Sequence, residues 1–152
     1  MDIKGSRLVW LVAAIGILGG CARKPGPATG DAATHASALL PKENEVTVQV
    51  VSKELLGKSF MPGGALARYQ KGKVSYEIFL GELPTPTDSA IVLAHWDQAL
   101  KNPKVVRSLD AYYGVDGGRP IYVFAREQWV AGIIGLSEEE ADRQARTLAE
   151  RL

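Results

Sequence analysis

The sequence has few of the residues on which small proteins commonly depend for cross-links, metal sites and catalysis. Its 152 residues include a single cysteine, Cys21, and two histidines, His35 and His95. One cysteine cannot form a disulfide within the chain, so a folded domain must be held together by its apolar core. Neither histidine has another histidine, a cysteine or an acidic cluster at the spacing of metal ligands, and we therefore expect no metal site.

The chain also lacks a surplus of charge. Removing Asp2, Lys4 and Arg7, which lie in the first twenty residues, from the 18 basic and 17 acidic side chains leaves 16 of each. A neutral chain has no excess of lysine or arginine to displace counterions from a phosphate backbone. We expect neither nucleic acid as the main partner nor electrostatic attraction to anionic lipid.

Catalytic and phosphate-binding motifs are missing as well. No serine stands in a Gly-x-Ser-x-Gly context, and the pairs Gly63-Gly64 and Gly117-Gly118 lack the flanking pattern of a phosphate-binding loop. Turns are the simpler interpretation of both pairs. The acidic run at Glu138 and Glu139 favours a solvated helix start over an acid/base pair. The sequence therefore predicts no catalytic residue and no non-covalent cofactor.

The N-terminal twenty residues have the organisation of a signal peptide. Lys4 and Arg7 precede an apolar run over residues 8–18. As a helix this run would rise about 16 Å, whereas a bilayer core needs about 30 Å. We expect residues 1–20 to be removed rather than to stay as a membrane span.

The segment Leu18-Gly19-Gly20-Cys21 resembles the bacterial lipobox. The resemblance implies cleavage between Gly20 and Cys21, a thioether-linked diacylglyceryl group and an N-acyl chain such as palmitate on Cys21. Two or three acyl chains attach a protein stably to a membrane, and a single acyl chain does not. The alternative is an ordinary signal peptide with a chance cysteine. Ala22 resembles the sorting position of an outer-membrane cargo, so we favour the periplasmic face of the outer membrane, with the inner membrane as the alternative.

The anchored chain is expected to divide into a tether and a domain. Residues 21–44 are rich in alanine, glycine, proline and threonine without sustained periodicity, which predicts a flexible linker with His35 as a solvated residue. Residues 45–152 are expected to form a single domain.

Alternating apolar residues predict several strands, and capping signals predict two helices. The stretch Val105 to Val115 is ambiguous and favours one strand after an irregular lead-in. The predicted strands are 46–50, 65–71, 74–80, 120–125 and 129–134, and the predicted helices follow Thr85 and Ser137. This order indicates an α+β fold, with a mostly antiparallel sheet of about five or six strands and two helices packed on one face. Gly81-Glu82-Leu83 and Gly135-Leu136 each follow a predicted hairpin and precede a capped helix. This similarity indicates either a weak internal repeat or a chance resemblance.

Three segments make the domain similar to an uncharacterised family of small bacterial exported domains, namely Gly64-Ala65-Leu66-Ala67-Arg68-Tyr69, Ile121-Tyr122-Val123-Phe124 and Ala131-Gly132-Ile133-Ile134-Gly135-Leu136. That resemblance carries no catalytic residue to transfer. It adds an exported location and no activity.

The leading functional hypothesis is a non-enzymatic envelope lipoprotein that binds a protein partner or assists an assembly. The alternative is a domain that binds a small hydrophobic ligand or a carbohydrate in a pocket near Trp96 and Trp129, and an unrecognised enzyme is the third. Trp96, Tyr113 and Trp129 are the candidate ligand or partner surface, although aromatic residues on strands and helices more often fill the core.

Overall fold

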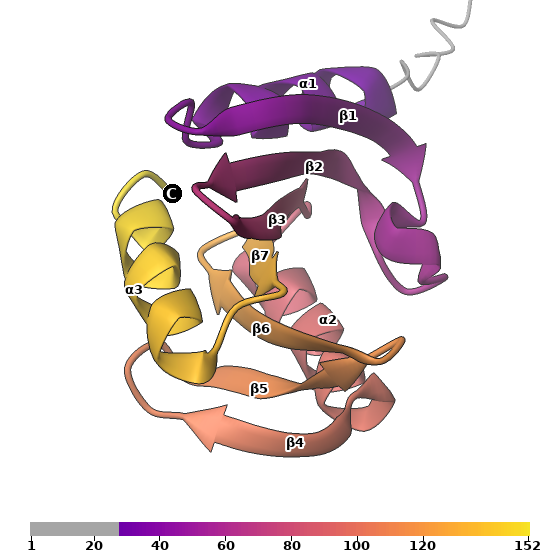
Figure 1. Ribbon diagram of the computed structural model, residues 1–152. Coiled ribbons are helices and arrows are strands. Elements are labelled where there is room, and N and C mark those ends of the chain that lie inside the picture. The colour runs from indigo at the N-terminus through magenta and orange to yellow at the C-terminus, as the bar shows by residue number, and fades with distance from the viewer. Residues whose placement is uncertain (1–27) are drawn as a thin grey trace, which may run out of the picture.

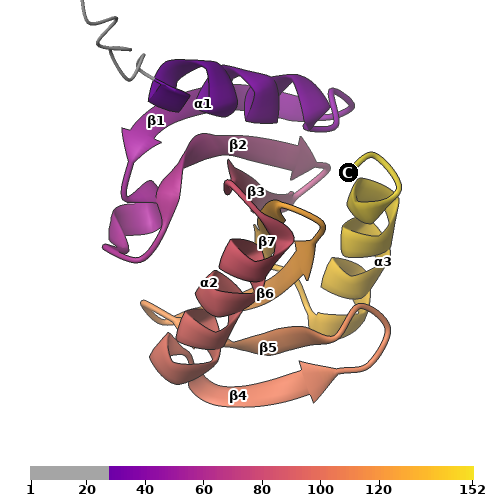
Figure 2. The same cartoon turned by 180° about the vertical axis from the view of Figure 1, so that it is seen from behind.

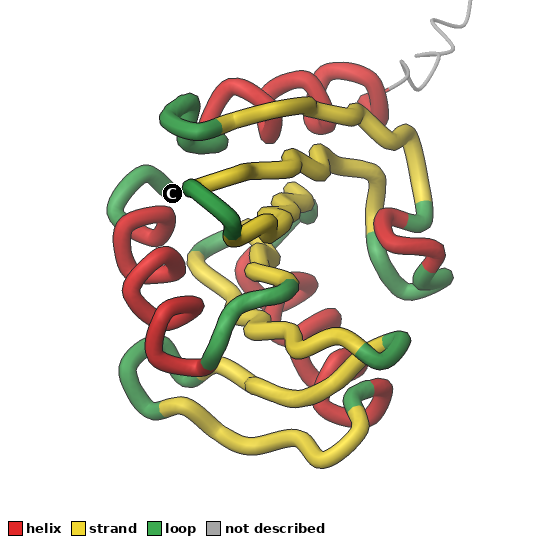
Figure 3. Tube along the Cα trace, viewed as in Figure 1, coloured by secondary structure: helices red, strands yellow, loops and turns green. Residues whose placement is uncertain are grey.

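The computed structural model describes residues 28–152. The described chain has three α-helices, one short 3-10 helix and seven strands (Figure 3). In chain order they are α1 (Ala28–Leu39), β1 (Glu45–Lys53), η1 (Leu55–Gly57), β2 (Pro62–Lys71), β3 (Val74–Glu82), α2 (Pro86–Ala99), β4 (Lys101–Val106), β5 (Ala111–Asp116), β6 (Arg119–Arg126), β7 (Trp129–Ile134) and α3 (Glu138–Ala149). No described helix is long and apolar enough to cross a membrane.

The strands form one antiparallel sheet in the order β1-β2-β3-β7-β6-β5-β4 (Figure 1). The expected α+β class and antiparallel pairing are confirmed. Strands β3 and β7 lie side by side at the centre, with Phe79 opposite Gly132. A Cβ on Gly132 would come within 2.4 Å of the Phe79 ring, so this pairing requires a glycine.

The prediction that the two expected helices pack on one face is wrong. Helix α3 packs in the same side-chain cluster as α1, and α2 packs in the cluster on the opposite face. In Figure 2, α2 lies in front of β6 and β7. The cause is visible in β6 and β7, where neighbouring residues such as Val130 and Ala131 are both fully buried on opposite faces. Strands that are apolar on both faces need cover on both sides, which three layers provide.

The prediction of five or six strands missed β4. This strand contains Pro103, and Asn102 beside it has a positive φ of 53°. Proline cannot donate to a ladder and is tolerated in an edge strand or at a bulge, and β4 is an edge strand whose register shifts between Lys101 and Lys104. Pro103 lies beyond the end of α2 at Ala99 and within a strand, so it does not end regular structure.

The prediction of a flexible linker up to residue 44 is also wrong from residue 28 onward. Helix α1 occupies Ala28–Leu39, and its side chains Ala33 and Ala36, together with Leu40 just beyond it, are buried against the sheet. These positions recur at helical spacing, and alanine is the best helix former. Small side chains let α1 approach the equally small Ala65 and Ala67 of β2 closely. The folded domain therefore includes residues 28–44.

Both predicted helix caps are confirmed. The Thr85 hydroxyl oxygen accepts a hydrogen bond from the backbone amide of Asp88, and Pro86 occupies the first turn of α2. At α3 the Ser137 hydroxyl oxygen accepts a hydrogen bond from the backbone amide of Glu140. The same hydroxyl donates a hydrogen bond to the Glu140 carboxylate. The chain thus starts α2 and α3 where the local sequence indicates.

Candidate functional site

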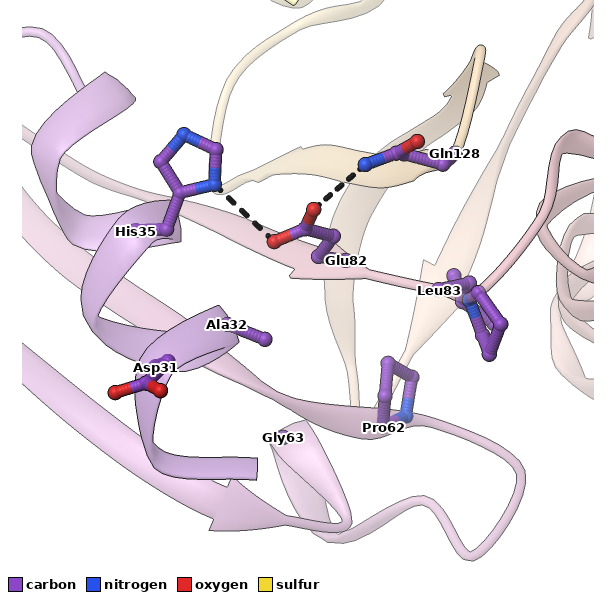
Figure 4. A pocket seen from close by; sticks show the side chains of 9 residues that line it. Asp31, Ala32, His35, Pro62, Gly63, Glu82, Leu83 and Gln128 are labelled. Atoms are coloured by element: carbon purple, nitrogen blue, oxygen red, sulfur yellow. Dashed lines mark hydrogen bonds and ion pairs between the residues drawn. The ribbon is translucent and has the colours of Figure 1, made fainter. Parts of the chain in front are cut away.

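A groove between α1 and one end of the sheet has a volume of about 720 Å³. It opens where the end of β3, the start of β2 and the turn between β6 and β7 meet (Figure 4). Its lining residues are Asp31, Ala32, His35, Pro62, Gly63, Glu82, Leu83, Pro84 and Gln128. These come from four separate segments of the chain, so only the folded domain creates the groove.

Glu82, the last residue of β3, is the central polar group of the groove. Its Oε2 lies 3.2 Å from Nδ1 of His35 on α1, and its Oε1 accepts a 2.6 Å hydrogen bond from Nε2 of Gln128. An ionised carboxylate only accepts, so Nδ1 of His35 carries the hydrogen. The Glu82 side chain is 18% exposed, which keeps the carboxylate accessible from the groove.

The turn that carries Gln128 is fixed to the start of α2. The amide of Leu83 donates to the carbonyl of Gln128 at 2.8 Å, and the hydroxyl of Ser89 donates to the carbonyl of Glu127 at 2.5 Å. Ser89 is 1% exposed, so this second contact is inside the protein. The turn that carries Gln128 is therefore tied both to the residue after Glu82 and to α2.

His35 is held on two sides. Its ring meets the Trp129 ring edge-on, with centroids 5.3 Å apart, in addition to its contact with Glu82. The prediction of a purely solvated linker histidine is therefore wrong, although the side chain remains 57% exposed. With Nδ1 committed to Glu82, Nε2 is the nitrogen available to a ligand.

The lining of the groove combines a few polar side chains with apolar walls. Two side chains carry carboxylates, Asp31 and Glu82, and the other polar side chains are His35 and Gln128. The remaining residues are apolar or glycine, with Pro62 and Pro84 giving stiff walls. No serine, threonine or cysteine that could act as a nucleophile lines the groove. Among the described residues no three histidine, cysteine or acidic side chains gather to hold a metal ion.

The aromatic residues proposed from the sequence do not form one surface. Trp96 is fully buried on the α2 face, where its indole N–H donates to the Met61 sulfur at 3.2 Å. Trp129 is buried on the opposite face, and it lies beside the groove because it pairs with Glu82 and contacts His35. Tyr113 is half-buried and donates to the carbonyl of Leu136. Gly20 and Cys21, the predicted cleavage and lipidation residues, lie outside the described residues.

A second polar cluster joins α3 to the sheet. The carboxylate of Asp142 accepts hydrogen bonds from Ser108, Tyr122 and Arg146, at 2.7 Å from the Tyr122 hydroxyl. Burial by itself raises the pKa of Asp142, but these hydrogen bonds together outweigh it and hold the pKa below its ordinary value. Burial, reinforced by Asp142, raises the pKa of Tyr122. The cluster is fully paired and packed, so it fixes α3 and offers no open site.

Sequence reasoning did not bring His35, Glu82 and Gln128 together. His35 and Glu82 are 47 residues apart, Glu82 and Gln128 are 46 residues apart, and no local motif links either pair. One weak signal was present. Glu82 stands between a strand and a capped helix, and acidic residues at strand ends commonly line sites.

Neither the sequence models of known protein families nor the sequences of curated proteins gave a match to this chain. Among solved structures, the fold is similar to a GTP binding regulator from Thermotoga maritima, with a TM-score of 0.56 and 10% sequence identity. The match covers 78% of this chain and 84% of that one. At this identity the likeness concerns the fold alone.

Proposed function

We propose that this protein is a lipid-anchored, non-enzymatic domain of the bacterial cell envelope that binds a protein partner through the groove beside Glu82. The anchor is Cys21, cleaved after Gly20 and carrying diacylglyceryl and N-acyl lipid, at the periplasmic face of the outer membrane. The lipobox resemblance supports this location. Asp31 follows Cys21 by ten residues, which extend at most about 35 Å, so the groove stays near the membrane surface.

The observation that carries a binding role is the make-up of the groove. Apolar walls with a few fixed polar groups are typical of recognition sites, and about 720 Å³ falls within the range of such sites. The groove is lined partly by prolines, which favours an extended peptide segment. Without a serine, threonine or cysteine among its lining residues, binding is better supported than catalysis through a hydroxyl or thiol nucleophile.

The fold likeness to a GTP binding regulator does not extend to nucleotide binding in this groove. A nucleoside triphosphate carries several negative charges, whereas the lining includes two carboxylates and no lysine or arginine. Phosphate recognition relies on cationic side chains or on free amides at a helix start. The charge of the groove therefore opposes such a ligand.

A small hydrophobic molecule or carbohydrate is the second candidate, because Leu83, Pro62 and Pro84 give an apolar surface of suitable size. A protein partner would leave covalent protein adducts after crosslinking, and a small molecule would not. The two candidates therefore separate in one experiment.

The test places a photo-crosslinking amino acid at Ala32, in the groove, in the full-length chain expressed in its own envelope. The matched control carries the same amino acid at Lys73, in the turn between β2 and β3 at the opposite end of those strands. We expect one repeatable protein adduct from position 32 and none from position 73. Equal adducts from both positions, or none from either, would reject the protein-binding groove.

The anchor is tested separately with Cys21→Ser. This variant should lose labelling by an alkyne palmitate analogue and should not be cleaved after Gly20. Labelling equal to that of the unaltered chain would reject Cys21 as the lipid site.

A further inference from the structure

The groove presents negative charge that its own residues do not neutralise. Of the nine lining residues, Asp31 and Glu82 carry carboxylates, and none is lysine or arginine. His35 is the only lining residue that can become cationic, and it contacts Glu82. A groove with apolar walls and uncompensated carboxylates is complementary to a ligand with a long aliphatic stem and a positive end.

Glu82 has the geometry to receive such an end. Each of its two oxygens accepts one hydrogen bond, from His35 and from Gln128, and a carboxylate offers about four acceptor positions. The two contacts hold the carboxylate in place and leave one acceptor position free on each oxygen. A guanidinium group pairs with a carboxylate through two parallel hydrogen bonds, so a fixed, half-open carboxylate is suited to arginine in particular.

We infer that the groove recognises an arginine or lysine side chain of an extended, otherwise apolar peptide, with the Glu82 carboxylate as the anchor for the cation. This inference rests on the proposed binding function of the groove and names the chemistry of its partner. The stem of the basic side chain lies along Pro62, Leu83 and Pro84, and Asp31 adds a second negative charge at the rim.

The experiment titrates the 15N-labelled chain with N-acetyl-leucyl-arginine amide and follows the backbone amides of Ala32, Leu83 and Gln128 by NMR. The matched probe replaces arginine by citrulline, which has nearly the same shape but no charge. We expect the arginine probe to shift these amides and the citrulline probe to bind at least about tenfold more weakly, as for a charge-assisted pair. Glu82→Gln should bring the arginine probe down to the citrulline level.

Failure of this inference is distinguishable from failure of the proposed function. Equal binding of the arginine and citrulline probes, or no shift with either, would overturn recognition of a cation. If Ala32 still crosslinked a protein partner, the groove would remain a binding site for a different chemistry. Loss of the crosslink with a positive arginine titration would leave the cation site and reject the protein partner.

Discussion

The two halves of the sheet are covered differently. Strands β6 and β7 have a helix on each face, because α2 packs against them from one side and α3 from the other. Strands β1 and β2 have α1 on one face, and on the other face the short η1 segment contacts β2. Val46 and Val50 of β1 are accordingly 57% and 50% exposed, whereas Val123 and Val130 are fully buried.

The difference bears on where a partner is proposed to bind. Both halves hold fully buried aromatic and branched side chains, and the paired Asp142 cluster fixes α3 in the second half. The first half supplies α1, most of the groove and a half-covered edge. Surfaces used for binding must remain partly uncovered, which favours this half for the proposed partner.

The sharpest way to break this comparison is to remove the centre of the core on the α2 face. Trp96 is fully buried and packs between Phe60 and Phe79, so Trp96→Ala should lower the free energy of unfolding by about 3–5 kcal/mol. Urea unfolding monitored by circular dichroism measures the change. Ile91→Ala, on the exposed side of the same helix, is the control and should cost less than about 0.5 kcal/mol. Equal losses would show that α2 does not define the core.

In the first half, Leu40→Ala should loosen α1 without unfolding the second half. Leu40 is fully buried at the end of α1, and removing such a side chain costs about 2–5 kcal/mol of packing. Hydrogen exchange followed by mass spectrometry should show faster exchange over residues 28–40 and unchanged protection in β6 and β7. Ala38→Ser, at an exposed position of α1, is the control. Equal acceleration in β6 and β7 would mean that α1 is part of a single cooperative unit.

Acid should weaken the second half through Asp142. Its pKa in the folded protein lies below the ordinary value of 3.8, so its contribution to stability is present above about pH 4 and is lost as the pH falls further. The difference in unfolding free energy between the unaltered chain and Asp142→Asn should therefore be larger at pH 7 than at pH 3. A difference that did not change with pH would contradict the paired, ionised Asp142.

The smallest effect is expected on the exposed edge of the first half. Val50→Ala should change the free energy of unfolding by less than about 0.5 kcal/mol, because half of the side chain is already in solvent. The matched substitution Val130→Ala removes the same atoms from a fully buried site and should cost about 2 kcal/mol. A Val50→Ala loss as large as that of Val130→Ala would mean that β1 is covered in solution.

Local patterns predicted most elements of the fold. The strand predicted over 74–80 and the two caps depend on neighbours within a few residues, and the structure has them as expected. Helix α1 was missed because its buried positions are alanines, whose burial depends on the small residues of β2 and not on their own hydrophobicity. Strand β4 was missed because Pro103 is compatible with a strand only at an edge, and strand order is a property of the whole sheet.

The candidate site was less accessible to prediction than the fold. Trp96 and Trp129 were chosen for residue type, yet they pack in separate clusters on opposite faces. His35 was assigned to a linker, and Glu82 and Gln128 had no local motif. Their meeting requires α1 to dock, β3 to end at Glu82 and the turn between β6 and β7 to lie beside it, which are three long-range events.

By itself the sequence determined the α+β class, most of the strands, both capped helices and the neutral charge of the chain beyond residue 20, since these depend on composition and on short-range periodicity. The lipobox at Cys21 also belongs to the sequence alone and remains a prediction. Only the tertiary structure decided which face each helix covers, that residues 28–40 belong to the domain and that Glu82 stands between His35 and Gln128. The physical reason is that the burial of a side chain and its contacts depend on strand order and on how the helices pack against the sheet, and both bring together residues that are far apart in the chain.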